Sequence, residues 1–301
     1  MILEFAQTLL FAATLLVSVA FAGYLLSIFV AGKSRAKAKV SVASAKHFED
    51  GVLGTNEITK TAEKPRRSVA WWANKLVLVA AILVMCSMVA RWIGTGKPPM
   101  ASHYEFAVMF CWGMLVFQLI FEWRYKVRTL SVLVLPVILG MLIYSTSLSY
   151  EANPLMPALQ NSPMLTLHVF TAALSYGAAV VSFGAGVMYL LSPYIKWRGW
   201  PKSEILDDLG YRAVVITYPL LTISIILGSL WANVAWGRYW SWDPKETAAL
   251  VTWFIYGAYL HARVVRGLRG KKAAWLLVLG FLAIIFTYFG NLWFGGLHSY
   301  V

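Results

Sequence analysis

Eight long apolar stretches dominate this chain of 301 residues and limit the folds that are open to it. Hydrophobic residues make up 59% of the sequence and charged residues 13%, whereas soluble domains carry about 25% charged residues. Each stretch is about long enough to cross a bilayer, and lipid offers backbone amides no hydrogen-bond partner, so each is expected to be a helix. We predict an all-α, polytopic transmembrane helical bundle of about eight spans, at residues 5–30, 72–93, 104–122, 130–149, 165–191, 212–231, 246–263 and 273–293.

The first stretch is interpreted as a retained helix, because it is too long for a signal-peptide core and no basic segment precedes it. The polar segment Lys33–Arg67 follows, rich in Ala, Ser and Lys without sustained periodicity. We predict that this segment is a flexible basic loop near anionic lipid headgroups. The chain then divides into residues 1–71, the first span and its linker, and residues 72–301, the main membrane domain.

The distribution of Lys and Arg predicts the orientation. The net charge is +13, but the basic residues lie between apolar stretches and not on a soluble fold, which favours a lipid bilayer over nucleic acid as the partner. Alternate connections carry most of them, so these connections are expected to face the cytoplasm and both termini the extracytoplasmic side. The opposite connections hold only Arg91, Lys97, Arg238 and Lys245.

The most unusual stretch on the predicted outer side is WGRYWSWDPKETAALVTWFIYGAYLH, residues 236–261. Asp243 suits a helix N-cap, Pro244 the first helical position and Glu246 the capping-box carboxylate. This helix start accounts for both carboxylates better than acid–base catalysis does. The preceding tryptophans form either an interfacial anchor or a platform for a flat ligand; they are Trp236, Trp240 and Trp242.

Histidine is scarce, with five residues in the chain, so its positions are informative. His168 falls near the outer end of the fifth span and His298 just past the last span, so they flank the tryptophan loop on one face. Two neutral imidazoles beside an aromatic shelf suit six-coordinate haem iron, and Arg238 and Lys245 suit its two propionates. For each histidine taken alone, a capping or interfacial role is the alternative.

His261 lies roughly 24 Å deeper than Lys245 along the predicted helix, in the cytoplasmic half of the bilayer. An ionisable side chain at that depth is either a ligand or, like the neighbouring Arg263, a residue of the inner interface. No second histidine of the chain is expected at that depth, so a haem there would need a ligand from another protein. His103 is interpreted as structural or peripheral, and Glu105 as a buried hydrogen-bonding residue.

The segment WGRYWSWDPKETAALVTW resembles the tryptophan-rich WWD signature of haem-handling cytochrome c biogenesis proteins. The version DPKET, followed by LHAR and by GLHSY at the C-terminus, is similar to the CcsA/ResC type, as are HYEF, PALQNSPMLTLHV and SYGAAVVSFG. The resemblance covers about residues 72–301. It departs from the family at His103, where Asn is frequent, and at Ser162–Pro163–Met164, where an aromatic sequence is more usual.

The resemblance implies that His168 and His298 are the axial ligands of haem b held against the WWD loop, at about residues 232–247. It also implies that His261 binds a haem within the membrane, completed by a histidine of a CcsB/ResB-type partner. The remaining haem-binding residues would be Trp236, Trp240, Trp242, Arg238 and Asp243.

The implied activity is that of the haem-binding subunit of a cytochrome c synthase, which moves haem outward and attaches it to the CxxCH cysteines of apocytochrome c. Such a protein acts through positioning and iron coordination. The expected location is the cell inner (plasma) membrane, or the thylakoid membrane if the chain is plastid-encoded. The alternatives are a membrane transporter or gate for another aromatic ligand, which typically shows paired repeats, and an electron-transferring cytochrome, which needs histidine pairs inside the bilayer.

Overall fold

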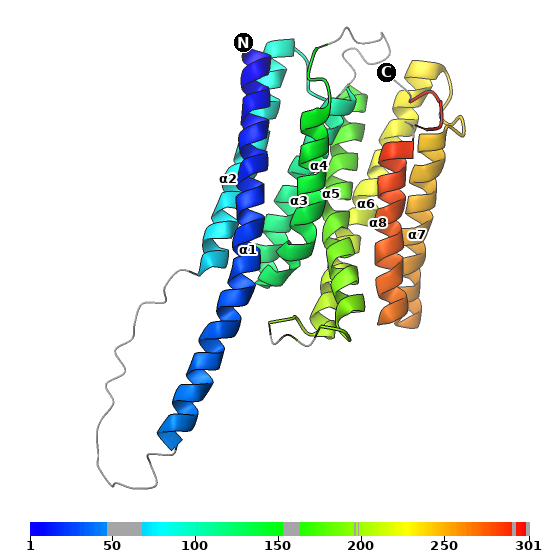
Figure 1. Cartoon of the computed structure of the whole chain (residues 1–301). Helices are drawn as coiled ribbons and strands as arrows, with labels where there is room; N and C mark the ends of the chain where they lie inside the picture. Colours follow the sequence, from blue (N-terminus) through cyan, green and yellow to red (C-terminus); the bar gives the residue numbers. More distant parts are fainter. Residues whose placement is uncertain are drawn as a thin grey trace.

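The computed structural model describes residues 1–46, 68–100, 102–152, 163–195, 197, 199–290 and 293–298. All regular structure within these ranges is helical (Figure 1), and each of the eight α-helices contains a stretch long and apolar enough to span a membrane. The predicted all-α bundle of about eight spans is therefore confirmed. The helices are α1 Ile2–Lys46, α2 Val69–Thr95, α3 His103–Tyr125, the short 3-10 helix η1 Arg128–Leu130, α4 Ser131–Ser147, α5 Pro163–Leu191, α6 Ser203–Trp236, α7 Pro244–Arg266 and α8 Lys271–Phe289.

Helix α1 extends beyond its predicted end. It continues to Lys46, so the prediction of a loop from Lys33 is wrong for residues 33–46. After Gly32 this segment contains neither Gly nor Pro, and its many Ala, Lys and Arg residues are good helix formers, so the helix propagates. The remainder of the predicted linker, residues 47–67, lies outside the described residues.

Helix α6 is also longer than predicted: it begins at Ser203 instead of residue 212 and ends at Trp236 instead of residue 231. Its first turns are amphipathic, with charged residues beside the buried Leu206 and Leu209, and an amphipathic start escapes a search for uniformly apolar stretches. The helix stops at Gly237, which has a φ of 71° and thus the left-handed conformation that glycine favours. The tryptophan loop that connects α6 to α7 is therefore residues 237–243.

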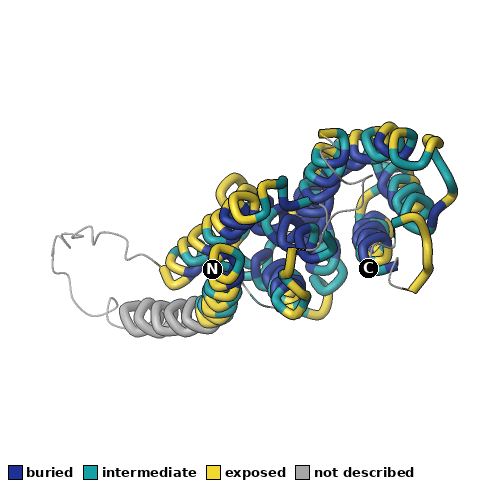
Figure 2. The backbone as a smooth tube through the Cα atoms, turned by 90° about the horizontal axis from the view of Figure 1, so that it is seen from above, coloured by how far each residue is buried: buried dark blue, intermediate teal, exposed yellow. Residues whose placement is uncertain are grey.

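Helix α5 forms the centre of the bundle. It packs against α3 and α4 on one side and against α6 and α8 on the other (Figures 1 and 2). Helix α1 packs on α2 and α4. Helix α7 packs on α8. The crossing of α3 and α5 depends on two glycines, because a Cβ on Gly177 would lie only 2.4 Å from the carbonyl carbon of Gly113. Small residues at such contacts let membrane helices approach closely, which is how α5 holds its neighbours in place.

One end of the bundle gathers the N-terminus, the described segment after α8, the start of α5 and the tryptophan loop; we call it the terminal end (Figure 1). A buried ion pair joins α2 to α3 at this end: Arg91 Nε lies 2.7 Å from Glu105 Oε1. Glu105 also accepts the backbone N–H of the N-cap residue Ser102, which confirms the prediction of a buried, hydrogen-bonded carboxylate. The opposite, basic end carries Arg124, Lys126, Arg128, Lys202, Arg266, Arg269, Lys271 and Lys272.

Candidate functional site

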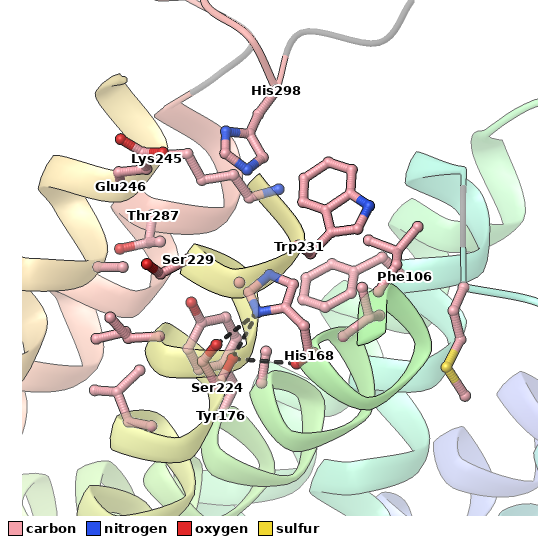
Figure 3. A pocket seen from close by; sticks show the side chains of 18 of the residues that line it. Phe106, His168, Tyr176, Ser224, Ser229, Trp231, Lys245, Glu246, Thr287 and His298 are labelled. Atoms are coloured by element: carbon pink, nitrogen blue, oxygen red, sulfur yellow. Dashed lines mark hydrogen bonds between the residues drawn. The ribbon is translucent and has the colours of Figure 1, made fainter. Parts of the chain in front are cut away.

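A cavity of about 140 Å³ opens at the terminal end between α3, α5, α6, α7 and α8 (Figure 3). One buried water needs roughly 10–15 Å³ of comparable space, so the cavity is large enough for part of an organic ligand. Its apolar wall includes Phe106, Tyr176, Trp231 and Trp240. Its polar groups come from Ser102, His103, His168, Ser224, Ser229, Lys245, Glu246, Thr287 and His298.

His168 reaches the cavity from the second turn of α5. Its Nδ1 lies 2.8 Å from the backbone carbonyl oxygen of Ser224 in α6. A carbonyl only accepts hydrogen bonds, so neutral His168 carries its proton on Nδ1 and presents the lone pair of Nε2. Gly228, one turn further along α6, provides the space for the ring, since a Cβ there would lie 2.7 Å from Cε1 of His168.

His298 enters the same cavity from the segment that follows α8. Its Nδ1 lies 2.8 Å from Oδ2 of Asp243, and its ring contacts Trp236 edge-on with ring centroids 4.9 Å apart. The second oxygen of Asp243 accepts the backbone N–H of Leu297 at 2.6 Å. Gly296 makes this approach possible, because a Cβ there would lie 2.3 Å from Asp243 Oδ1.

The ionisation states of Asp243 and His298 follow from their surroundings. Burial raises the pKa of the Asp243 carboxyl, but hydrogen bonds from His298 and from the amides of Lys245 and Leu297 outweigh it and bring that pKa to about 2. Burial lowers the pKa of His298, the Lys245 ammonium lowers it further, and the hydrogen bond to Asp243 opposes both. At neutral pH Asp243 is ionised, and His298 is neutral with its proton on Nδ1.

The two histidines therefore share one arrangement: Nδ1 donates to an oxygen, and Nε2 keeps its lone pair. Histidines that bind metals in proteins almost always donate their other ring N–H to a carboxylate or a backbone carbonyl. Among the described residues no group of three or more His, Cys, Asp or Glu side chains could hold a metal ion. Two imidazoles in this arrangement suit a metal that already has four ligands in a plane, as haem iron does.

The three predicted tryptophans occupy different positions relative to the cavity. Trp240 lines the cavity, whereas Trp242 is 70% exposed and meets Trp240 edge-on at a centroid distance of 5.9 Å. Trp236 lies behind His298 and packs edge-on against the buried Trp231, with ring centroids 4.8 Å apart. Trp242 has a φ of 58°, which is uncommon for a bulky residue and shapes the loop immediately before α7.

Asp243 begins α7 with the predicted capping box: its carboxylate accepts the N–H of Lys245, and Glu246 Oε2 accepts the N–H of Asp243. The second predicted cationic residue of the loop, Arg238, is exposed and is not among the residues that line the cavity. Lys245 does line it.

His103 was expected to be structural or peripheral. The structure excludes the peripheral alternative, because His103 lies in the cavity wall, where Nε2 lies 2.7 Å from the hydroxyl of Tyr144 and the ring packs against Tyr288. The expectation overlooked the neighbours because both tyrosines belong to other helices, far away in the sequence. Trp231 and Gly228 were also missed as residues of the site. Trp231 was the last residue of the predicted sixth span, and a glycine inside an apolar stretch carries no signal of its own.

His261 lies on α7 near the basic end of the bundle, about 24 Å along the helix from Lys245. Its side chain is exposed and belongs to one stripe of exposed residues at helical spacing, together with Val251, Phe254 and Val265. His261 is not among the residues that line the cavity.

Comparison with known proteins agrees with this architecture. The model of the family described as cytochrome C assembly protein matches residues 100–298, which contain every residue of the cavity. The chain is 36% identical over 251 residues to the cytochrome c biogenesis protein CcsA of Guillardia theta, covering 74% of this chain and 83% of that protein. It is 36% identical over 267 residues to the CcsA protein of Chlamydomonas reinhardtii, covering 83% of this chain and 73% of that protein.

A solved structure, the cytochrome c heme lyase CcmF, superposes with a TM-score of 0.59 at 19% identity, covering 93% of this chain and 46% of that one. At this level of identity the likeness concerns the fold. The family match and the identities to the CcsA proteins carry the assignment: the chain belongs to the cytochrome c assembly protein family, as a multi-pass membrane protein of the CcsA type with a role in cytochrome c biogenesis.

Proposed function

We propose that this chain is the haem-binding subunit of a membrane cytochrome c synthase, and that the cavity at the terminal end holds haem b as the substrate to be attached. His168 and His298 provide the two axial ligands. The observation that supports this most strongly is their shared geometry, because each ring has Nδ1 fixed by an oxygen acceptor and each lines the same cavity. Phe106, Trp231 and Trp240 provide apolar and aromatic surface for the porphyrin ring.

The chemistry needs little from the protein beyond positioning. Each cysteine thiol of a CxxCH segment adds across one vinyl group of haem, so that a C–S bond forms and the thiol hydrogen moves to the terminal vinyl carbon, with no net oxidation. Holding haem in one orientation next to the docked segment turns a bimolecular reaction into a local one, which is the expected source of rate. The side chains of the chain bind, orient and shield the haem, and the cofactor supplies the reactive groups.

The terminal end faces the extracytoplasmic side in this proposal, and the basic end faces the cytoplasm, in line with the positive-inside rule. His261 then lies in the cytoplasmic half of the bilayer and provides one ligand to a haem that has not yet reached the outer cavity. A CcsB/ResB-type membrane partner supplies the other ligand. The support is that His261 is exposed on a stripe of α7 that the rest of the described chain leaves uncovered.

The visible spectrum of the full chain, purified with any partner that accompanies it, tests the ligand assignment. Six-coordinate haem is expected in the unmodified protein and should be lost in His168→Ala and in His298→Ala. His103→Ala is the matched control, because this third histidine lines the same cavity but has Nε2 bonded to Tyr144. An unchanged spectrum in the first two variants would contradict the assignment.

Attachment is tested separately by coexpression with an apocytochrome that contains one CxxCH segment. Covalently bound haem, which survives denaturing electrophoresis, is expected with the unmodified chain and not with either ligand variant. A chain that binds haem but never yields covalent product would be a haem transporter and not part of a synthase.

A further inference from the structure

Lys245 is the only Lys or Arg among the described residues that line the cavity. It is the second residue of α7, and its backbone N–H is used by the carboxylate of Asp243 at 3.0 Å. Its side chain leaves the helix start and extends into the cavity toward α3 (Figure 3). The Nζ atom ends 5.6 Å from the ring centroid of Phe106 on the opposite wall.

The two acidic residues nearest to Lys245 in sequence are occupied by other donors. Asp243 accepts hydrogen bonds from His298 and from the backbone amides of Leu297 and Lys245. Glu246 accepts from the backbone amides of Ser241 and Asp243. Within the part of the chain that the structure describes, no carboxylate lies within ion-pair distance of Lys245 Nζ, and its contact is with the face of Phe106.

An ammonium group buried in a cavity with no carboxylate at ion-pair distance is unfavourable, and a single aromatic ring offsets only part of that cost. A ligand with a negative charge would offset the cost of this ammonium group in the cavity. Haem brings two carboxylates on one edge of a flat apolar ring. An ammonium and a carboxylate that meet away from water form a strong, charge-assisted hydrogen bond.

The two axial ligands alone leave one degree of freedom. Bonds from His168 and His298 define an axis through the iron perpendicular to the ring, and the ring can still turn about that axis. A positive charge at one point of the cavity edge removes this freedom, because it selects the position of the carboxylate edge. The vinyl groups lie on the half of the ring away from the carboxylates, so the position of that half is set as well.

We propose that Lys245 Nζ binds a carboxylate of haem in the outer cavity and thereby sets the rotation of the ring about the axis through His168 and His298. This assignment rests on the proposed function, since it takes haem as the ligand of the cavity. Arg238, which is exposed and outside the cavity, does not take part in this contact. Lys245 is a positioning residue: it binds the haem edge and does not touch the vinyl groups.

The test compares haem with haem dimethyl ester, in which both carboxylates are capped, as ligands of the purified full chain and its Lys245→Met variant. The unmodified chain should bind haem about ten- to a hundredfold more tightly than the diester, as expected for a hydrogen bond to a charged group. Lys245→Met should lose that preference by binding haem more weakly and the diester as before. Retained diester binding also shows that the variant is folded and that its histidines still bind iron.

The matched control is Lys97→Met, which removes a lysine at the same end of the bundle but outside the cavity; its preference for haem should stay unchanged. Lys245→Arg should keep a large part of the preference. If Lys245→Met discriminates between haem and diester as well as the unmodified chain does, the assignment of Lys245 is overturned while the ligand roles of the histidines stand. If the unmodified chain binds neither compound with a six-coordinate spectrum, the proposed function itself fails.

Discussion

Nδ1 of His298 donates a hydrogen bond to Oδ2 of Asp243 at 2.8 Å, and this contact joins the segment after α8 to the first turn of α7. The same carboxylate caps α7 and accepts the amide of Leu297. One side chain thus fixes the helix start, the course of the C-terminal segment and the tautomer of a proposed iron ligand. The aspartate of the WWD signature has a structural explanation in these three contacts.

We expect Asp243→Asn to weaken haem binding about 10- to 100-fold, which is typical for the loss of a partner behind a metal-binding histidine. The amide still accepts hydrogen bonds but carries no charge, so His298 becomes a poorer donor to iron. Haem content after purification and titration of the haem-free protein measure the effect. Glu246→Gln is the control, because it alters the capping box but keeps the hydrogen bond between His298 and Asp243; equal losses in both variants would point to the helix start and not to the histidine.

Gly228→Ala tests the position of His168. The added Cβ would lie 2.7 Å from Cε1 of the imidazole, so the ring must move away from the carbonyl of Ser224 or the helices must separate. We expect loss of the six-coordinate spectrum and a fall in the free energy of unfolding of about 1–3 kcal/mol, as overpacking usually produces. Gly140→Ala in α4, where a new Cβ meets nothing within 4 Å, should leave both measurements unchanged.

The pH dependence of iron binding follows from the pair His298–Asp243. Burial lowers the pKa of His298 below its usual value of 6.5, so the neutral ring persists as the pH falls through 6.5. The absorption band of six-coordinate haem should therefore remain at pH 6 and disappear only in more acidic solution. A band that titrates with a midpoint at or above 6.5 would contradict the burial of His298 behind Asp243.

The same shifts predict how stability changes with pH. The folded protein binds a proton at His298 less readily than the unfolded chain does, so the free energy of unfolding decreases as the pH falls below about 6.5. Asp243, whose pKa falls from 3.8 to about 2, contributes stability above pH 3.8 that is lost as the pH approaches 2. Both groups therefore destabilise the fold in acid, and thermal unfolding in detergent as a function of pH measures the sum. Asp243→Asn should reduce the dependence at the acidic end.

The buried pair of Arg91 and Glu105 gives a prediction about stability alone. Arg91→Leu removes the guanidinium that forms the ion pair with the buried carboxylate of Glu105, so we expect a loss of about 3–5 kcal/mol in the free energy of unfolding. The double variant Arg91→Leu/Glu105→Leu should recover part of that loss, because it also removes the buried carboxylate. Thermal unfolding of the purified variants is the measurement, and a double variant no more stable than Arg91→Leu would show that the pair is not the cause.

The sequence could predict the helices because lipid leaves the backbone no alternative to helical hydrogen bonding. The ends of the helices were less predictable. Helix α6 starts at Ser203 with an amphipathic turn outside its apolar stretch, and helix α1 ends with the polar residues 33–46. A change in hydrophobicity therefore marks neither the start of α6 nor the end of α1. Asp243 was the exception, because a capping box has a sequence pattern of its own.

The site could be predicted where it depends on rare residues. His168 and His298 were expected on one face, and the structure places both in one cavity. The acceptors behind them were not predictable from composition: Ser224 contributes a backbone carbonyl, which every residue has. Contacts between helices far apart in the sequence, such as that of His103 with Tyr144, depend on helix rotation, which a pattern of apolar residues does not specify.

The last prediction concerns His261 and the route by which haem reaches the cavity. If His261 binds haem at the inner side together with a partner protein, His261→Leu should deplete haem from the complex as purified from cells. The cavity at the terminal end is about 24 Å away along α7, so it should still bind haem added to the purified variant and show a six-coordinate spectrum. Val265→Leu alters the same exposed stripe one turn further along the helix and should leave the haem content unchanged. A His261→Leu variant purified with a full complement of haem would mean that haem enters the outer cavity by another route, whereas a variant that cannot bind added haem would place His261 in the support of the cavity itself.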